Sequence, residues 1–289
     1  MIPGNAALGI AVMALVTLGF AAESVIVRML AGEIPAFQIG FTRVLFGLAA
    51  LAPWLIARPA RLATRARWSH LIRAGLKLLS LVLLFAAMQR APLASVTAIG
   101  FASPLFVALG AWAVLGEMPG PLRIGGLITG FLGILVILGP AAGGAQGAAL
   151  MLALGSAILT ATIQLMLKAM GRAEGAIALV GWNLILSLPL AAIPAAMVWV
   201  WPDPGQWGLL ALQGAIGTGC QLGVTRALQL ADASLVAPVD FLRLPLVAIA
   251  AWLVFAEMPP LATLGGGAMI LVAVSLLSLS ARRPAAPIR

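Results

Sequence analysis

The chain has little charge, a single cysteine and a single histidine, and each scarcity excludes a class of protein. Only 9% of the 289 residues are charged, whereas soluble domains carry about 25%. One Cys and one His cannot build a disulfide framework or a Cys/His metal cluster, so no metal or cofactor site is expected. No Lys or Arg precedes the first apolar run. The N-terminus therefore lacks the basic region of a signal peptide and is expected to remain as a first helix.

Apolar sequence is what the chain has in abundance. It is 63% hydrophobic with a mean hydropathy of +1.13, which leaves too few polar residues for a water-facing surface and predicts a lipid bilayer as the surroundings. Backbone polar groups find no water in hydrocarbon, so each apolar stretch is expected to be a helix. The predicted spans, separated by Pro and Gly, are 8–30, 36–57, 71–90, 93–115, 121–139, 147–169, 176–200, 207–229, 233–255 and 261–281.

The net charge of +9 is distributed as a topology signal, which explains it without a nucleic-acid partner. Under the positive-inside rule, the arginines between the second and third spans place that loop in the cytoplasm. Alternation then puts the other basic loops on the same side and the loops with Glu33, Asp203 and Glu257 on the opposite side. This pattern predicts a multi-pass protein of the bacterial inner membrane with both termini cytoplasmic. The arginines of that loop are Arg58, Arg61, Arg65, Arg67 and Arg73.

Two long segments of the chain repeat each other. Residues 87–119 have the sequence AMQRAPLASVTAIGFASPLFVALGAWAVLGEMP, and residues 227–259 have ALQLADASLVAPVDFLRLPLVAIAAWLVFAEMP. The offset is a constant 140 residues, as from Trp112 to Trp252, and about fifteen of forty positions are identical when the comparison extends through Gly126 and Gly266. Five spans per half force the second copy to insert upside down. The sequence thus predicts an all-α membrane protein of ten helices in two inverted five-helix repeats, residues 1–140 and 141–289, as in many secondary carriers.

The strings LASVTAIGFASPLFVALGAWAVLGE and ASLVAPVDFLRLPLVAIAAWLVFAE resemble the two EamA repeats of the drug/metabolite transporter superfamily. The resemblance covers nearly the whole chain. It implies alternating access around a central cavity and transport of a small metabolite, foremost export of amino acids or their relatives. Import of a riboflavin- or S-adenosylmethionine-type metabolite is the alternative. The family pattern ends the fourth and ninth spans in Gly-Glu. Gly116 conforms and Ala256 departs, which weakens the expectation of a tight turn at that position.

Charged residues inside the spans are the first candidates for a substrate cavity, because a charge at a helix centre costs about 2.5–3.5 kcal/mol on insertion scales. Glu23 in the first span either titrates or binds a cation, or it pairs with Arg43 in the second span. Arg43 itself either binds a substrate carboxylate or serves that ion pair, and the pairing role is favoured.

The ninth span carries a second candidate pair. Asp240 and Arg243 share one helix face at i,i+3 and lie between two prolines that can kink the helix. Their repeat equivalents are Gly100 and Ser103, so the first half lacks the pair. The two residues either belong to the substrate path or lock the helix in register.

Neutral polar residues complete the predicted cavity. Gln164, whose repeat equivalent is Ser24, and Gln221 in the eighth span either face a zwitterionic substrate or bond neighbouring helices. Trp182, beside Asn183 in the seventh span, is a candidate for stacking on a ligand rather than for anchoring at the membrane interface. A polar row on the eighth span joins Gln213, Gly217, Gln221 and Thr225.

The remaining expectations concern partners and rival functions. The lone His70 is expected at the surface, and the glycine runs 125–126 and 265–267 are expected to serve helix packing or a dimer face. The partners predicted are a small-molecule substrate and the bilayer, with the chain either a monomer or a homodimer. An integral-membrane enzyme would need convergent catalytic groups, which the sequence does not show, and a passive channel is the other rival.

Overall fold

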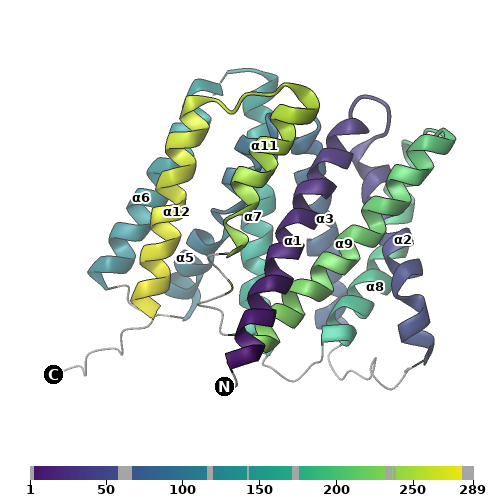
Figure 1. Ribbon diagram of the computed structural model, residues 1–289, viewed down its shortest axis with the longest axis horizontal. Coiled ribbons are helices and arrows are strands. Elements are labelled where there is room, and N and C mark those ends of the chain that lie inside the picture. The colour runs from purple at the N-terminus through teal and green to yellow at the C-terminus, as the bar shows by residue number, and fades with distance from the viewer. Residues whose placement is uncertain are drawn as a thin grey trace.

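The computed structural model describes residues 3–57, 67–115, 120–141, 143–170, 176–231, 236 and 239–281 and forms a bundle of helices (Figure 1). No strand occurs in these ranges. The elements are α1 (Pro3–Met29), α2 (Ala36–Ala57), α3 (Arg67–Met88), α4 (Leu93–Gly100), α5 (Ser103–Leu115), α6 (Pro121–Leu138), the 3-10 turn η2 (Gly139–Ala141), α7 (Ala145–Met170), α8 (Ala176–Met197), α9 (Pro204–Leu230), α11 (Arg243–Phe255) and α12 (Leu261–Ala281).

Eight helices of the described residues are long and apolar enough to cross a membrane, taking Leu93–Ala113 as one. The span predicted at 207–229 corresponds to α9, which is long but carries four glutamines and lies outside that set. The span predicted at 233–255 corresponds in part to α11, a shorter apolar helix, and in part to positions that the structure does not describe. An all-helical membrane protein is therefore confirmed, and the count of ten spans stays a prediction.

The fourth span is broken near its middle. α4 ends at Gly100 and α5 begins at Ser103, with a turn at Phe101 and Ala102 between them. Pro104 lacks the N–H that would continue the helical ladder, which explains the break. A similar turn at Phe241 precedes α11, and the rings of Phe101 and Phe241 meet edge to face at 5.3 Å. These two phenylalanines are repeat equivalents, so the two breaks meet inside the bundle.

Helices α6 and α12, which are repeat equivalents, pack side by side at one edge of the bundle (Figure 1). A Cβ at Gly133 would lie 2.7 Å from the carbonyl oxygen of Gly266, and one at Gly126 would lie 3.1 Å from that of Ala273. Only glycine permits this approach. A Cβ at Gly125 would meet nothing within 4 Å. The predicted packing role is confirmed for Gly126 and Gly266, and a dimer face at Gly125 stays a prediction.

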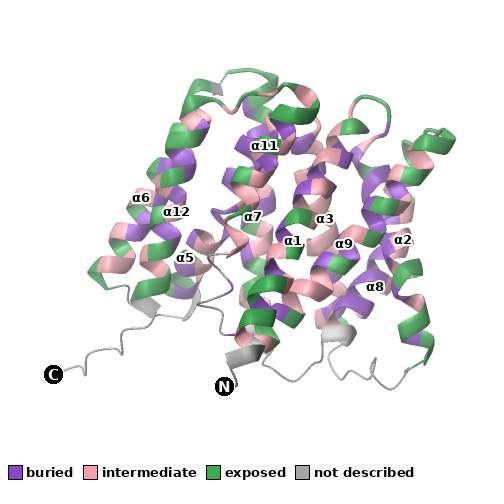
Figure 2. Cartoon of the chain, in the orientation of Figure 1, coloured by how far each residue is buried: buried purple, intermediate pink, exposed green. Residues whose placement is uncertain are grey.

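The ends of the helices sort into two groups. The first turn of α1 and the last turn of α12 lie at one end of the bundle, together with the C-terminal end of α5 (Figure 1). The C-terminal end of α11, the repeat equivalent of α5, lies at the opposite end. Buried positions face the bundle interior and exposed apolar side chains such as Leu15 and Leu253 cover the outside (Figure 2). Such a surface suits lipid.

The turn after α11 forms even though alanine replaces the family's glycine. Ala256 has φ +53°, its N–H donates to the Trp252 carbonyl at 2.9 Å, and the Glu257 N–H donates to the Ala251 carbonyl at 3.2 Å. A left-handed backbone costs a residue with a Cβ about 1 kcal/mol or more. The doubt that the sequence raised about a tight turn at this position is therefore wrong, and the turn aims Glu257 back at the bundle.

Candidate functional site

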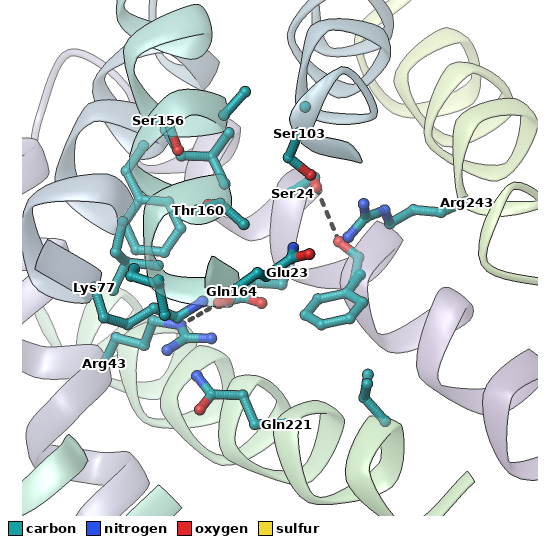
Figure 3. Close-up of a pocket in the computed structure, with 18 of the residues that line it drawn as sticks. Glu23, Ser24, Arg43, Lys77, Ser103, Ser156, Thr160, Gln164, Gln221 and Arg243 are labelled. Atoms are coloured by element: carbon teal, nitrogen blue, oxygen red, sulfur yellow. Dashed lines mark hydrogen bonds and ion pairs between the residues drawn. The ribbon is translucent and has the colours of Figure 1, made fainter. Parts of the chain in front are cut away.

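A cavity of about 490 Å³ lies inside the bundle. Its described lining comes from both halves of the chain, namely from α1 to α5, α7 to α9 and α11, whereas α6 and α12 contribute no residue to it. One stretch of wall is apolar and another carries charged and amide side chains (Figure 3). A mostly apolar cavity with a few convergent polar groups is the usual form of a small-molecule site.

Glu23 on α1 and Arg43 on α2 form a buried ion pair through Oε1 and Nε (Figure 3). Their side chains are 7% and 5% exposed, and both line the cavity. A buried carboxylate without its partner would cost several kcal/mol, so Glu23 depends on Arg43 for its burial. The pairing predicted from the sequence is present. Because the pair also faces the cavity, a direct role with substrate stays a prediction.

Gly217 on α9 makes room for the guanidinium of Arg43. A Cβ at this position would lie 2.6 Å from Nη2 and 2.7 Å from Nε of Arg43. The glycine therefore positions Arg43 on its carboxylate. In the polar row predicted on this helix, only Gln221 and Thr225 line the cavity, whereas Gln213 is fully buried outside its described lining.

Asp240 and Arg243 lie across the cavity from that pair, with 4.0 Å between Oδ2 and Nη2. The guanidinium of Arg243 lies 4.7 Å from the ring centroid of Phe101 and 5.1 Å from that of Phe20. These rings attract a cation through their negative faces. Oδ1 of Asp240 and Nε of Arg243 are buried without a hydrogen-bond partner among the described residues. These two atoms are closed off from solvent, so the hydrogen bonds that the pair could offer a ligand come from its other polar atoms.

Neutral polar side chains from α1, α7, α8 and α9 add to the wall. Ser24, Gln164, Asn183 and Gln221 all line it, as the sequence predicted without being able to place them. Ser24 donates to the Phe20 carbonyl at 2.9 Å. Hydroxyls of Ser156 and Thr160, on the same face of α7 as Gln164, each lie 3.0 Å from the hydroxyl of Ser80 on α3.

Trp182 lies elsewhere. Unlike its neighbour Asn183, it is absent from the described lining of the cavity, and its ring stacks on His70 with centroids 6.1 Å apart. His70 is 0% exposed, so the expectation of a surface histidine is wrong: α8 packs over this part of α3 and covers it. Nδ1 of His70 lies 3.2 Å from Nη2 of Arg73, which donates to the Leu179 carbonyl at 2.8 Å.

Two basic residues of α3, Arg73 and Lys77, line the cavity, although the sequence did not indicate this position for either of them. Arg73, which the sequence assigns to the cytoplasmic loop, is buried nearly two turns inside the helix. Lys77 follows one turn later in an otherwise apolar stretch. A lysine this far inside a span is itself a signal of a functional position. Among the described residues, no group of three His, Cys, Asp or Glu could hold a metal ion.

At the end of the bundle away from the first turn of α1 and the last turn of α12, a third ion pair joins distant segments. Arg28 on α1 pairs with Glu257 after α11 at 3.2 Å and donates to the Met88 carbonyl at 3.0 Å. Glu257 accepts from the Leu93 N–H at 2.7 Å. Nearby, the Gln38 side chain pairs with both backbone groups of Val200. These contacts tie α1 to the turn after α11 and to the ends of α3 and α4, and they tie α2 to the segment after α8.

Comparisons with known proteins agree on one family. The EamA-like transporter family matches residues 7–139 and again residues 147–279. The chain is 31% identical over 251 residues to a riboflavin transporter of Vibrio cholerae, covering 85% of this chain and 83% of that protein. It is 27% identical over 263 residues to an S-adenosylmethionine uptake transporter of Rickettsia bellii, covering 91% and 90%.

Two further matches bear on direction and fold. A pseudopaline exporter of Pseudomonas aeruginosa is 28% identical over 278 residues, covering 93% of this chain and 95% of that protein. One crystal structure superposes with a TM-score of 0.63 at 18% identity, covering 98% of this chain and 99% of that one. At that identity the superposition supports the fold alone.

Proposed function

This chain belongs to the EamA-like transporter family, and from that membership we propose that it is a secondary carrier that moves a small metabolite by alternating access. Family and relatives indicate a multi-pass transporter of the bacterial inner membrane and not an enzyme. The observation that carries the proposal is the cavity between the two halves, with the Glu23–Arg43 pair in its wall. Intramembrane charges that face a cavity are typical of substrate pathways.

Contacts related by exchange of the two halves support the inverted-repeat arrangement, with residues 1–140 and 141–289 as its units. Ser80 donates to the Ser156 carbonyl at 3.1 Å, and the exchanged pair, Cys220 and Val16, makes the same contact at 3.6 Å. Such an arrangement provides two opposite-facing states from one architecture. We further propose that the end of the bundle carrying both termini faces the cytoplasm, which agrees with the distribution of arginine.

For the substrate, export of an amino acid or a related amphipathic metabolite fits the mixed apolar and amide wall of the cavity. Import of a riboflavin- or S-adenosylmethionine-type metabolite is the second candidate. It is favoured by the relatives at 31% and 27% identity that carry those names. A symmetric carrier runs in either direction, so the gradient of substrate and coupling ion sets the direction of net transport.

Counterflow in proteoliposomes tests the carrier mechanism. Purified protein is reconstituted and loaded with an excess of one unlabelled compound, and uptake of the same compound in labelled form is followed. The compounds are amino acids, riboflavin and S-adenosylmethionine, and protein-free liposomes are the control. A carrier shows saturable, transient accumulation for its substrate class. A linear, non-saturable flux would identify a channel, and chemical conversion of the compound would identify an enzyme.

A further inference from the structure

Exchange of the two repeats relates the helix pair α2 and α9 to the helix pair α8 and α3, and the two pairs carry their cavity cations on non-equivalent helices. In one arrangement, Arg43 on α2 fills the space that Gly217 on α9 leaves open. Exchanging the halves by 140 residues replaces Arg43 with Asn183 on α8 and Gly217 with Lys77 on α3. Helices α3 and α8 pack together, and both of these residues line the cavity. The short amide of Asn183 therefore occupies the position equivalent to the long guanidinium of Arg43. Lys77, on the helix packed against α8, supplies the cation instead.

The acid that neutralises one cation is missing beside the other. Arg43 pairs with Glu23, whereas the repeat equivalent of Glu23 is Ile163, which also lines the cavity. The second acid of the described lining, Asp240, lies against Arg243. Lys77 has no ion pair or hydrogen bond with any residue of the described part of the chain. Its ammonium points toward the Glu23–Arg43 pair in Figure 3, and no carboxylate among the described residues pairs with it.

The charge of the described part of the cavity wall also favours an anion. Its described lining holds two carboxylates, Glu23 and Asp240, against four basic side chains, Arg43, Arg73, Lys77 and Arg243. A net positive, partly desolvated cavity attracts anions and repels cations. An unpaired charge at this depth is costly unless something in the cavity offsets it.

An apolar surface continues from Lys77 along the same helix. Leu81, Leu84, Phe85 and Met88 follow at helical spacing and line the cavity with it. Across from this face, α7 presents Ser156, Thr160 and Gln164. A ligand lying along α3 would meet an ammonium at one end, hydroxyls and an amide at its side, and an apolar wall beyond.

We propose that Lys77 is the anion-binding residue of the transport cavity, and that the substrate is a small metabolite with a carboxylate or phosphate head and an apolar body. This inference rests on the proposed carrier function and adds the charge of the substrate to it. Lys77 contacts the head, and the α3 face beyond it contacts the body.

The test uses a reporter thiol in the cavity, which works without knowledge of the substrate. Gln164, exposed within the cavity, is replaced by Cys in a Cys220→Ser background of the full chain. Its labelling rate is measured with the anionic sulfonatoethyl and with the cationic trimethylammonioethyl methanethiosulfonate. The ratio of the anionic to the cationic rate is then divided by the same ratio for Met258→Cys on the surface. We expect Lys77→Gln and Lys77→Met each to lower this ratio about threefold or more, because one nearby charge acts on the two reagents with opposite sign.

Two controls separate the local charge from a general one. Lys77→Arg should keep the ratio, and Arg90→Gln, which removes an equal charge at an exposed turn, should leave it unchanged. A ratio that both neutral Lys77 variants leave unchanged would overturn the proposal. If instead labelling behaves as expected and no compound shows counterflow, the carrier mechanism fails and the anion site stands.

Protection of the same thiol identifies the head group. The probes are 3-phenylpropionate, phenyl phosphate and the neutral 3-phenylpropionamide at equal concentration. Slower labelling with the carboxylate, the phosphate or both, lost in Lys77→Gln, supports the proposal and distinguishes the two heads. Equal protection by the amide, or none by either anion, contradicts it.

Discussion

Arg28 and Glu257, which are 229 positions apart, form an ion pair between Nη2 and Oε2 at 3.2 Å. The pair ties α1 to the turn after α11. Through the Met88 carbonyl and the Leu93 N–H, it also contacts the end of α3 and the start of α4. All of these groups lie at the end of the bundle opposite the termini. In an alternating-access cycle this end must open, so the pair is placed to stabilise the state closed at this end.

Glu257→Gln should shift the balance toward the state open at that end. The side chains are 25% and 15% exposed, so the pair is worth on the order of 1 kcal/mol, or up to about fivefold in population. The measurement is labelling of Thr97→Cys, a cavity position, by an impermeant reagent added from that side. Arg90→Gln, which removes an exposed charge at the same end, is the matched control and should change nothing. Equal rates in both variants would remove Arg28 and Glu257 from the gating step.

Glu23→Gln should reduce transport more than expression, because the substitution keeps shape and removes charge. Arg43→Ala should instead lower expression, since stranding a buried acid costs about 3–5 kcal/mol. Fluorescence-detected gel filtration measures expression, and counterflow measures transport. If Glu23→Gln transports at the wild-type rate with the wild-type pH dependence, the pair is structural only.

Gly217→Ala should preserve folding and impair transport several-fold. The added Cβ would lie within 2.8 Å of the guanidinium atoms of Arg43, and because these form the end of a flexible side chain, Arg43 can move away from Glu23. Gly219→Ala on the same helix meets nothing within 4 Å and is the control. Initial counterflow rates of the two variants provide the test. Indistinguishable rates would show that the placement of Arg43 is not critical.

The swap Asp240→Arg with Arg243→Asp should restore expression that either single neutralisation lowers, but not transport. Both charges remain in the swap, so neither is stranded. The contacts of Arg243 with Phe20 and Phe101 are lost, however, and with them the orientation of the cation. Counterflow of the swapped protein decides the matter. Normal transport would identify the pair as a lock that holds the helix in register.

Positions 120 and 258 should label from opposite sides of the membrane. Gly120 precedes α6 and Met258 precedes α12, both are exposed, and these helices are repeat equivalents. Gly120→Cys is expected to react only from the cytoplasm and Met258→Cys only from the other side, in right-side-out and inverted vesicles of a Cys220→Ser background. Reaction of both from one side would contradict the inverted arrangement.

Several features of the site followed from residue order alone. Glu23 and Arg43 could be paired from the sequence because two charges in neighbouring apolar spans have few other partners. Glycines 126 and 266 could be assigned to packing because a repeated small residue in a span permits close approach. Lys77 could not be placed in the same way, because a long side chain in a span can reach either the membrane surface or a cavity.

The sequence by itself determined the membrane environment, the helical class, the repeat and the family, because hydropathy and a constant 140-residue offset are properties of the order of residues. Only the tertiary structure decided which faces of the helices meet. Where α8 packs on α3, His70 is buried under Trp182, and that tryptophan does not line the cavity. Lys77 on the same helix α3 does line the cavity. Rotation of a helix about its axis is set by contacts with its neighbours, and those contacts lie far apart in the chain.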